Sequence, residues 1–272
     1  METMTDMLSH ARTMAILIAL CVPGAASAAA QQKTDASFHW AGAMAAGKTL
    51  RIMNVNGSIQ ATSASGGDAT VSAVRKSRKS DPASVEIRVE QEADQVTICA
   101  VWPNQQGAAG CNGRSNDHNN KHSDNNDVDV TFSVNVPAGV KFEGVTVNGT
   151  VNATGLAADA EITSVNGNVS LTTRGTGSAE TVNGDVVLRL GASSWTGDLE
   201  AKTVNGSVTV EMPTPANLEV RANTLNGEIS SEFPLTLQGK MSPHSMRGTI
   251  GNGGSRLELS TVNGAIELKK AN

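Results

Sequence analysis

Two histidines four residues apart stand in a strongly polar segment near the middle of the chain. His118 and His122 have three aspartates beside them, Asp117, Asp124 and Asp127. Imidazole and carboxylate groups together can bind Zn²⁺ or Ni²⁺. The segment has almost no apolar residue, however, so a metal ion would have to order flexible chain. We therefore expect a solvated loop with no metal and no cofactor, and keep a metal-binding module as an alternative function.

Other residues that could do chemistry are few. The sequence contains neither Gly-x-Ser-x-Gly nor His-Glu-x-x-His. Polysaccharide-cleaving β-repeat enzymes need paired carboxylates on adjacent repeats, and the residues after the repeated Asn-Gly pairs described below do not supply them. Only Trp40, Trp102 and Trp195 could act as aromatic platforms for sugars. We predict no catalytic residues and no enzyme, with a carbohydrate-active β-helix enzyme as an alternative.

Composition restricts both the core and the partners. Aromatic residues make up 3% of the chain, which has no Tyr and 27 Gly. Because aromatic side chains usually supply much of a core, the interior must here be built from Val, Ile, Leu and Ala. This indicates a thin core between closely spaced strands. The formal net charge of −5 offers no electrostatic footprint for nucleic acid, and we expect no such partner.

Residues 1–30 are typical of a signal peptide. Arg12 precedes an apolar stretch from Met14 to Val22, and small residues follow up to Ala30. The stretch is too short to span a bilayer, which needs about 20 apolar residues. No second apolar stretch follows, so we predict no integral membrane span after cleavage. The chain is expected to be exported to the periplasm, the cell surface or the extracellular space.

Two cysteines, Cys99 and Cys111, remain after removal of the signal peptide. An even pair in an exported protein favours a disulfide over free thiols. The bridge would close a loop of about a dozen residues and stabilise the fold by about 3 kcal/mol in the loop-entropy model.

An Asn-Gly repeat organises the chain from residue 56 to its end. The residue before each Asn is Val or Leu, and the residue three after it is Val or Ile. After the second copy the spacings are 18, 17, 22, 21 and 37 residues, and the last spacing predicts one repeat that has lost its Asn-Gly. The structural repeat residues are Asn56, Gly57, Asn148, Gly149, Asn166, Gly167, Asn183, Gly184, Asn205, Gly206, Asn226, Gly227, Asn263 and Gly264.

Two all-β structures compete for this repeat. A two-residue Asn-Gly hairpin would pair each preceding Val with a residue that is polar in six of seven copies, which is poor sheet patterning. If the strand continues through the pair, the residues at −1, +1, +3 and +5 from Asn all point to one side. We therefore predict a single-stacked parallel β-solenoid, in which the Asn residues point outward or mark corners and can form a hydrogen-bonded ladder. An antiparallel β meander of hairpins is the alternative.

The chain after the signal peptide is expected to form a single β-repeat domain, residues 31–272. Alternating apolar and polar residues predict irregular N-terminal strands at 38–102. A polar disordered insert follows at 104–127, and the regular Asn-Gly rungs occupy 137–270.

The order of these features resembles the bacterial putative adhesin domain family, exported envelope proteins of unknown function built from Asn-Gly β-repeats. The resemblance covers roughly residues 38–270. It rests on the run Leu50-Arg-Ile-Met-Asn-Val-Asn-Gly57, on the step Pro137-Ala-Gly139, and on rungs such as Thr181 to Val186. It implies a β-solenoid, export and a surface or adhesive role. It brings no catalytic residues, and residues 104–127 are an insertion relative to its pattern.

Together these features predict a non-enzymatic exported scaffold or adhesion module of the envelope. Long faces of stacked rungs, lined by Thr, Ser, Asn and charged side chains, suit repeated weak polar contacts with a glycan or protein partner of the envelope or surface. The residues do not identify that partner.

Overall fold

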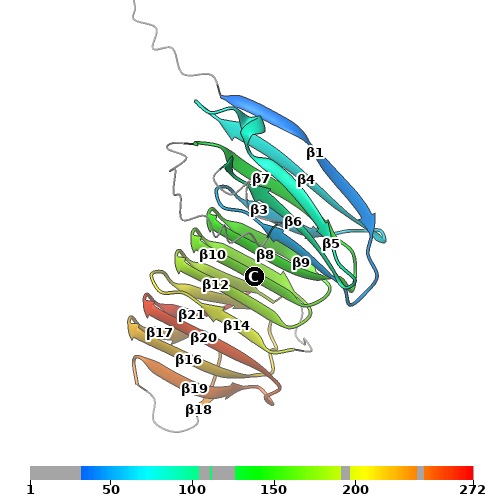
Figure 1. Cartoon of the computed structure of the whole chain (residues 1–272). Helices are drawn as coiled ribbons and strands as arrows, with labels where there is room; N and C mark the ends of the chain where they lie inside the picture. The colour runs from blue at the N-terminus through cyan, green and yellow to red at the C-terminus, as the bar shows by residue number, and fades with distance from the viewer. Residues whose placement is uncertain (1–31, 104–110, 112–125, 191–196, 238–241, 272) are drawn as a thin grey trace, which may run out of the picture. The chain divides into compact units, whose positions relative to one another are not determined.

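The computed structural model describes residues 32–103, 111, 126–190, 197–237 and 242–271 (Figure 1). The predicted signal peptide, His118 and His122 lie outside the described residues. The residues from Gln32 onward group into one unit, separate from those before it.

Each of the seven Asn-Gly pairs of the repeat is a corner between two strands that lie in two different sheets. Sheet B, of 11 strands, takes the strand before the corner, and sheet A, of 10 strands, takes the strand after it. One corner with its two strands is a rung. The Asn-Gly rungs are β2 (Thr49–Met53) with β3 (Ile59–Ser63), β8 (Lys141–Asn148) with β9 (Val151–Leu156), β10 (Ala160–Asn166) with β11 (Val169–Thr173), β12 (Gly177–Asn183) with β13 (Val186–Arg189), β14 (Leu199–Lys202) with β15 (Val208–Met212), β16 (Leu218–Asn226) with β17 (Ile229–Ser231), and β20 (Ser255–Asn263) with β21 (Ile266–Lys270).

Neighbouring rungs pair in parallel, with equivalent residues in register. Asn166 lies beside Asn148 and Asn183 in sheet B, and Val169 lies beside Val151 and Val186 in sheet A. Parallel pairing of successive repeats is the mark of a solenoid, because a hairpin would pair them antiparallel. The predicted parallel β-solenoid is therefore confirmed, and the hairpin meander does not occur in these rungs.

The last two rungs stack in the reverse of their chain order. β20 lies between β14 and β16, and β21 lies between β15 and β17. Asn263 accordingly forms a β-bridge with Asn205, although Asn226 comes between them in the sequence. The spacing of 37 residues was interpreted as a lost rung, and that prediction is wrong. The intervening chain contains β18 (Thr236–Leu237) and β19 (Ser245–Ile250), and β19 pairs antiparallel with β16.

The described residues contain an eighth pair of strands that stacks on these rungs. β6 (Gln95–Val101) pairs in parallel with β2, and β7 (Asp129–Val136) pairs in parallel with β3. In chain order, the predicted polar insert 104–127 lies between these two strands, mostly outside the described residues. Antiparallel strands complete this end: β5 (Glu86–Gln91) on β6, β4 (Asp68–Ser77) on β7, and β1 (Lys33–Ala43) on β4, with a 3-10 turn η1 (Pro82–Ser84) before β5. β1 falls partly outside the N-terminal strands predicted at 38–102.

The corners explain why the repeat needs asparagine. From Asn148 onward, each Asn side-chain amide donates to the side-chain oxygen of the preceding Asn in the stack, at 2.8–2.9 Å, so that six hydrogen bonds join the seven corners. The order of this ladder is Asn56, Asn148, Asn166, Asn183, Asn205, Asn263, Asn226. The ladder that the sequence allowed is present, and it follows the stacking order rather than the chain order.

Glycine is required because neighbouring corners approach one another closely. A Cβ at Gly206 would lie 2.0 Å from the carbonyl oxygen of Gly184, and a Cβ at Gly264 would lie 1.9 Å from that of Gly206. Those same carbonyl oxygens accept the hydroxyls of Thr203 and Thr261, two residues before each Asn. This buried Thr or Ser at position −2 was not identified from the sequence, although it recurs at six corners.

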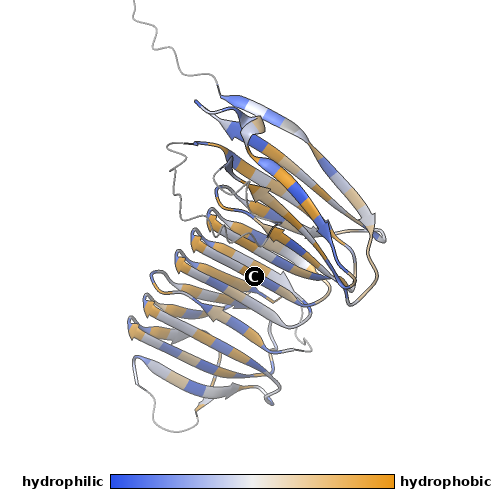
Figure 2. Ribbon diagram, in the orientation of Figure 1, coloured by the Kyte–Doolittle hydropathy of each residue, from blue (hydrophilic) through white to orange (hydrophobic). Residues whose placement is uncertain are grey.

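At six of the seven corners, all but that of Val55, the apolar residue before the Asn is exposed rather than in the core. Val147, Val165, Val182 and Val204 are 36–40% exposed, and Leu225 is 67% exposed. The prediction that −1 and +3 share one side is wrong, because the chain turns at the Asn-Gly corner. Positions +3 and +5 do point inward, as Val208 and Val210 show. They pack between the two sheets with residues from sheet B, and the strands alternate between apolar and polar residues (Figure 2).

Candidate functional site: the outer face of sheet B

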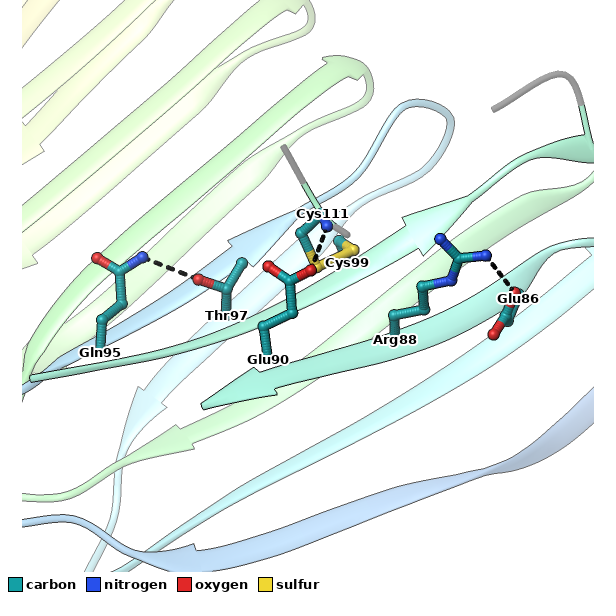
Figure 3. The surroundings of a disulfide bond; sticks show 7 residues. All are labelled: Glu86, Arg88, Glu90, Gln95, Thr97, Cys99 and Cys111. Atoms are coloured by element: carbon teal, nitrogen blue, oxygen red, sulfur yellow. Dashed lines mark hydrogen bonds and ion pairs between the residues drawn. A yellow bond between two sulfur atoms is a disulfide. The ribbon is translucent and has the colours of Figure 1, made fainter. Parts of the chain in front are cut away.

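Several residues with potential chemistry serve the fold instead. Cys99 and Cys111 form a disulfide with a Cα–Cα distance of 5.6 Å. The backbone amide of Cys111 also donates to Glu90 Oε1 at 2.6 Å (Figure 3). The bridge thus ties the chain after β6 to that strand and its neighbour β5. Trp102 is buried, so it cannot serve as an exposed platform for a sugar ring.

Asp127 is the one described member of the predicted histidine-aspartate cluster, and it anchors the end of the insert. Its carboxylate accepts the backbone N–H groups of Arg78, Lys79 and Ser80 at 2.9–3.0 Å. These hydrogen bonds, that from Ser80 foremost, hold the pKa of Asp127 far below its usual range. The carboxylate therefore faces the loop after β4. The part of the chain that the structure describes contains no group of three or more metal-ligating residues.

Replacing Asp127 with Asn should lower the free energy of unfolding at pH 7. Because the folded pKa is depressed, the carboxylate stabilises the fold above its unfolded pKa of about 3.9, and this contribution is lost as pH falls towards the folded value. Urea titrations at pH 7 and pH 2 should show a smaller difference between wild type and Asp127→Asn at pH 2. Asp68→Asn is the control, since it removes an exposed carboxylate. An equal difference at both pH values would contradict the anchoring role.

Residues Gly42 to Thr49 match the phosphate-loop pattern Gly-x-x-x-x-Gly-Lys-Thr, but the fold does not use it as one. A phosphate loop lies between a strand and a helix, whose N-terminal amides hold the anion. Here the segment links β1 to β2, and the Gly47 amide donates to the carbonyl oxygen of Gly139 at 2.8 Å. The match is therefore a coincidence of sequence.

The outer face of sheet B gathers charged side chains instead. The residue five before each Asn points outward, and the rungs bring these residues into register across the sheet. In stacking order this row is Arg51, Glu143, Glu161, Ser178, Glu200, Glu258 and Arg221. At a strand spacing of about 4.8 Å, the part from Glu143 to Glu258 extends for about 19 Å.

A groove of about 540 Å³ runs along this row. Its charged lining includes Glu143, Glu161, Glu200 and Glu258 from position −5, with Lys141, Asp159, Asp198 and Arg256 from position −7. Six of these eight side chains are acidic. We call this feature the sheet-B groove. Its carboxylates present several hydrogen-bond acceptors in a row, which suits hydroxyl or ammonium donors on a ligand.

Some of the acids in the groove have partners and others do not. Arg51 pairs with Glu143 at 3.1 Å, and Lys202 pairs with Glu200. Burial raises the pKa of Glu143; Arg51 opposes that rise and the neighbouring Glu161 adds to it. Among the described residues, Glu161 and Glu258 make no ion pair. Both are therefore available to a ligand.

The sequence carries the signal for this face at position −5, five residues before each Asn of the repeat. Stacked acids were sought after each Gly and were not found. That expectation concerned only the residues after each Gly; at position −5 the structure pairs Glu143 with Glu161 and Glu200 with Glu258 on adjacent rungs. Position −5 is acidic in four of the seven copies. The repeat pattern alone does not locate the corner, and the location of the corner decides which positions face outward.

Comparisons with known proteins agree with this architecture. The family model Toastrack DUF4097 matches residues 61–269. A putative cell adhesion protein from Clostridium sporogenes is 12% identical over 89% of this chain and 100% of that one, with a TM-score of 0.44. A putative adhesin from Bacteroides fragilis is 12% identical over 89% and 99%, with a TM-score of 0.38. Likenesses this remote carry no argument about what the present chain binds.

No curated protein matches the sequence. Among the described residues, no helix is long and apolar enough to cross a membrane. The match to the family model covers most of the chain, including all but the first of the Asn-Gly corners. The chain therefore belongs to the Toastrack DUF4097 family.

Proposed function

We propose that this protein is a non-enzymatic, exported scaffold or adhesion module of the bacterial envelope, and that the sheet-B groove is its contact surface. The observation that carries the proposal is the register of position −5. One solvent-facing side chain per rung repeats along the groove, while positions +3 and +5 are used by the core. Such a row makes many weak contacts with an extended partner and does not converge on one reacting atom.

An envelope glycan fits this surface best. Sugar hydroxyls donate hydrogen bonds to carboxylates, and a linear glycan can follow a groove about 19 Å long. Export follows from the N-terminal segment 1–30 and is supported by the disulfide, since disulfides persist in oxidising compartments. The adhesive role is consistent with the resemblance to the bacterial putative adhesin domain family.

The test combines cell fractionation with binding to a glycan panel. The mature protein should appear in the periplasmic or surface fraction, and it should bind glycans without changing their length. Retention in the cytoplasm, or the absence of binding to any glycan, would contradict adhesion. Binding to an envelope protein alone would favour the scaffold role.

One observation favours a second function, a carbohydrate-active enzyme. Glu143 and Glu161 are neighbours on adjacent strands beside the groove, and the pKa of Glu143 is raised, as that of a general acid must be. The ion pair with Arg51 opposes this role by favouring the charged form of Glu143. Chain cleavage by wild type that is lost in Glu143→Gln would establish the enzyme and overturn our proposal.

A further inference from the structure

Three arginines lie together where the outer face of sheet B approaches its C-terminal end. Arg221 on β16 stands directly opposite Arg247 on the antiparallel strand β19. Arg256 comes from β20, on the other side of β16, and is in register with Glu219. These four side chains surround a notch of about 90 Å³, which we call the arginine notch.

The three arginines differ from the other bases of this face. Arg51, Arg88, Lys141 and Lys202 each form an ion pair with a neighbouring carboxylate. Within the described residues, the side chains of Arg221, Arg247 and Arg256 form no hydrogen bond and no ion pair. Their guanidinium groups therefore retain their donors for a ligand.

The positions of these arginines do not stabilise the sheet. Like charges directly opposite one another on antiparallel strands destabilise the pair, and Arg221 and Arg247 are such a pair. An anion between them would reverse the sign of this contribution. Guanidinium groups bind carboxylate, sulfate and phosphate through two parallel hydrogen bonds, with more geometric specificity than lysine has.

We propose that the arginine notch binds one oxyanion group of a glycan whose sugar rings lie along the sheet-B groove. The inference rests on the proposed function and narrows its ligand class. Arg256 lines both the notch and the groove, so the two are continuous. The notch, at about 90 Å³, is much smaller than the groove of about 540 Å³ and suits a single carboxylate, sulfate or phosphate group.

The neighbouring acids restrict the ligand further. Glu258 is in register with Arg221, and Glu200, Glu161 and Glu143 follow along the row. This row repels a glycan that is negatively charged at every sugar, and it accepts hydrogen bonds from the hydroxyl groups of neutral sugars. The ligand is therefore a mainly neutral glycan with an isolated acidic group, rather than a uniform polyanion.

The experiment compares matched glycans on the mature protein. Each neutral oligosaccharide of a panel is presented beside the same oligosaccharide with one terminal carboxylate or sulfate, together with dextran sulfate as a polyanion. The singly charged glycan should bind at least about tenfold more tightly than its neutral partner, the effect of a charge-assisted hydrogen bond. That advantage should disappear in the variant Arg221→Gln with Arg247→Gln, and inorganic phosphate should displace the charged glycan from wild type.

The control variant is Arg189→Gln with Arg78→Gln, which removes the same charge from β13 of sheet A and from the loop after β4, and should keep the advantage. Equal binding of the neutral and the charged glycan would overturn the proposal that the arginine notch binds an oxyanion group. It would leave the proposed function unaffected. Phosphate binding that depends on the arginines, with no glycan bound, would overturn the glycan assignment and the adhesive function together. Arginine-dependent binding to vesicles of anionic lipid, with no glycan bound, would replace the glycan by a membrane. The competition by phosphate uses wild type only, so it remains decisive if the variant does not fold.

Discussion

Gly206→Ala is expected to lower the free energy of unfolding by more than about 4 kcal/mol, or to prevent folding. The new Cβ would lie 2.0 Å from the carbonyl oxygen of Gly184 and 2.5 Å from its carbonyl carbon. Neither backbone can move away, because Gly184 N–H donates to Asn205 and Gly206 N–H donates to Asn263, at 2.9 and 3.0 Å. A single methyl group would therefore force the corners at Gly184 and Gly206 apart.

Urea denaturation followed by circular dichroism measures this loss, and the yield of soluble protein serves as readout if the variant does not fold. The control is Gly66→Ala, where a Cβ would meet nothing within 4 Å and stability should change by less than about 0.5 kcal/mol. A loss below about 1 kcal/mol in Gly206→Ala would show that the corners do not stack as closely as described.

Removal of the disulfide is expected to have the second large effect on the free energy of unfolding. Cys99→Ala combined with Cys111→Ala should lower the free energy of unfolding by about 3 kcal/mol, because the unfolded chain is freed from a cross-link between residues 12 apart. The effect should be concentrated at the β5–β6 end of sheet B, where Cys111 also contacts Glu90.

The same denaturation experiment on wild type with a thiol reductant should reproduce the loss. The control is the double variant with reductant, which should show no further change. If wild type and variant unfold at the same urea concentration under oxidising conditions, the bridge contributes nothing and its structural role is excluded.

The sequence predicted the type of fold and the function of its most repeated residues. Parallel stacking, the Asn ladder and the inward positions +3 and +5 followed from spacing and parity, and the disulfide followed from an even pair of cysteines in a chain expected to be exported. These features are local, since each is determined by a few residues of one repeat and its neighbour.

Two other features could not be derived in that way. The stacking order of the last two rungs is invisible in the sequence because the corners at Asn226 and Asn263 offer the same hydrogen bonds to Asn205. The outward face was misjudged because a strand drawn straight through Asn-Gly places Val182 inside, whereas the corner leaves it 40% exposed. With the corner at Asn-Gly, position −5 lies on the outward face of sheet B.

We propose that the outer face of sheet B, and not that of sheet A, contacts the partner. Two variants matched by exposure test it: Glu161→Ala with Glu200→Ala on sheet B, and Asn152→Ala with Thr209→Ala on sheet A. Binding of each variant to purified envelope glycan is measured by titration, after thermal unfolding has confirmed that both are folded. We expect at least about tenfold weaker binding for the sheet-B variant, from the loss of hydrogen bonds to two carboxylates, and unchanged binding for the sheet-A variant. Weaker binding of the sheet-A variant alone, or equal binding of both variants and wild type, would contradict the claim.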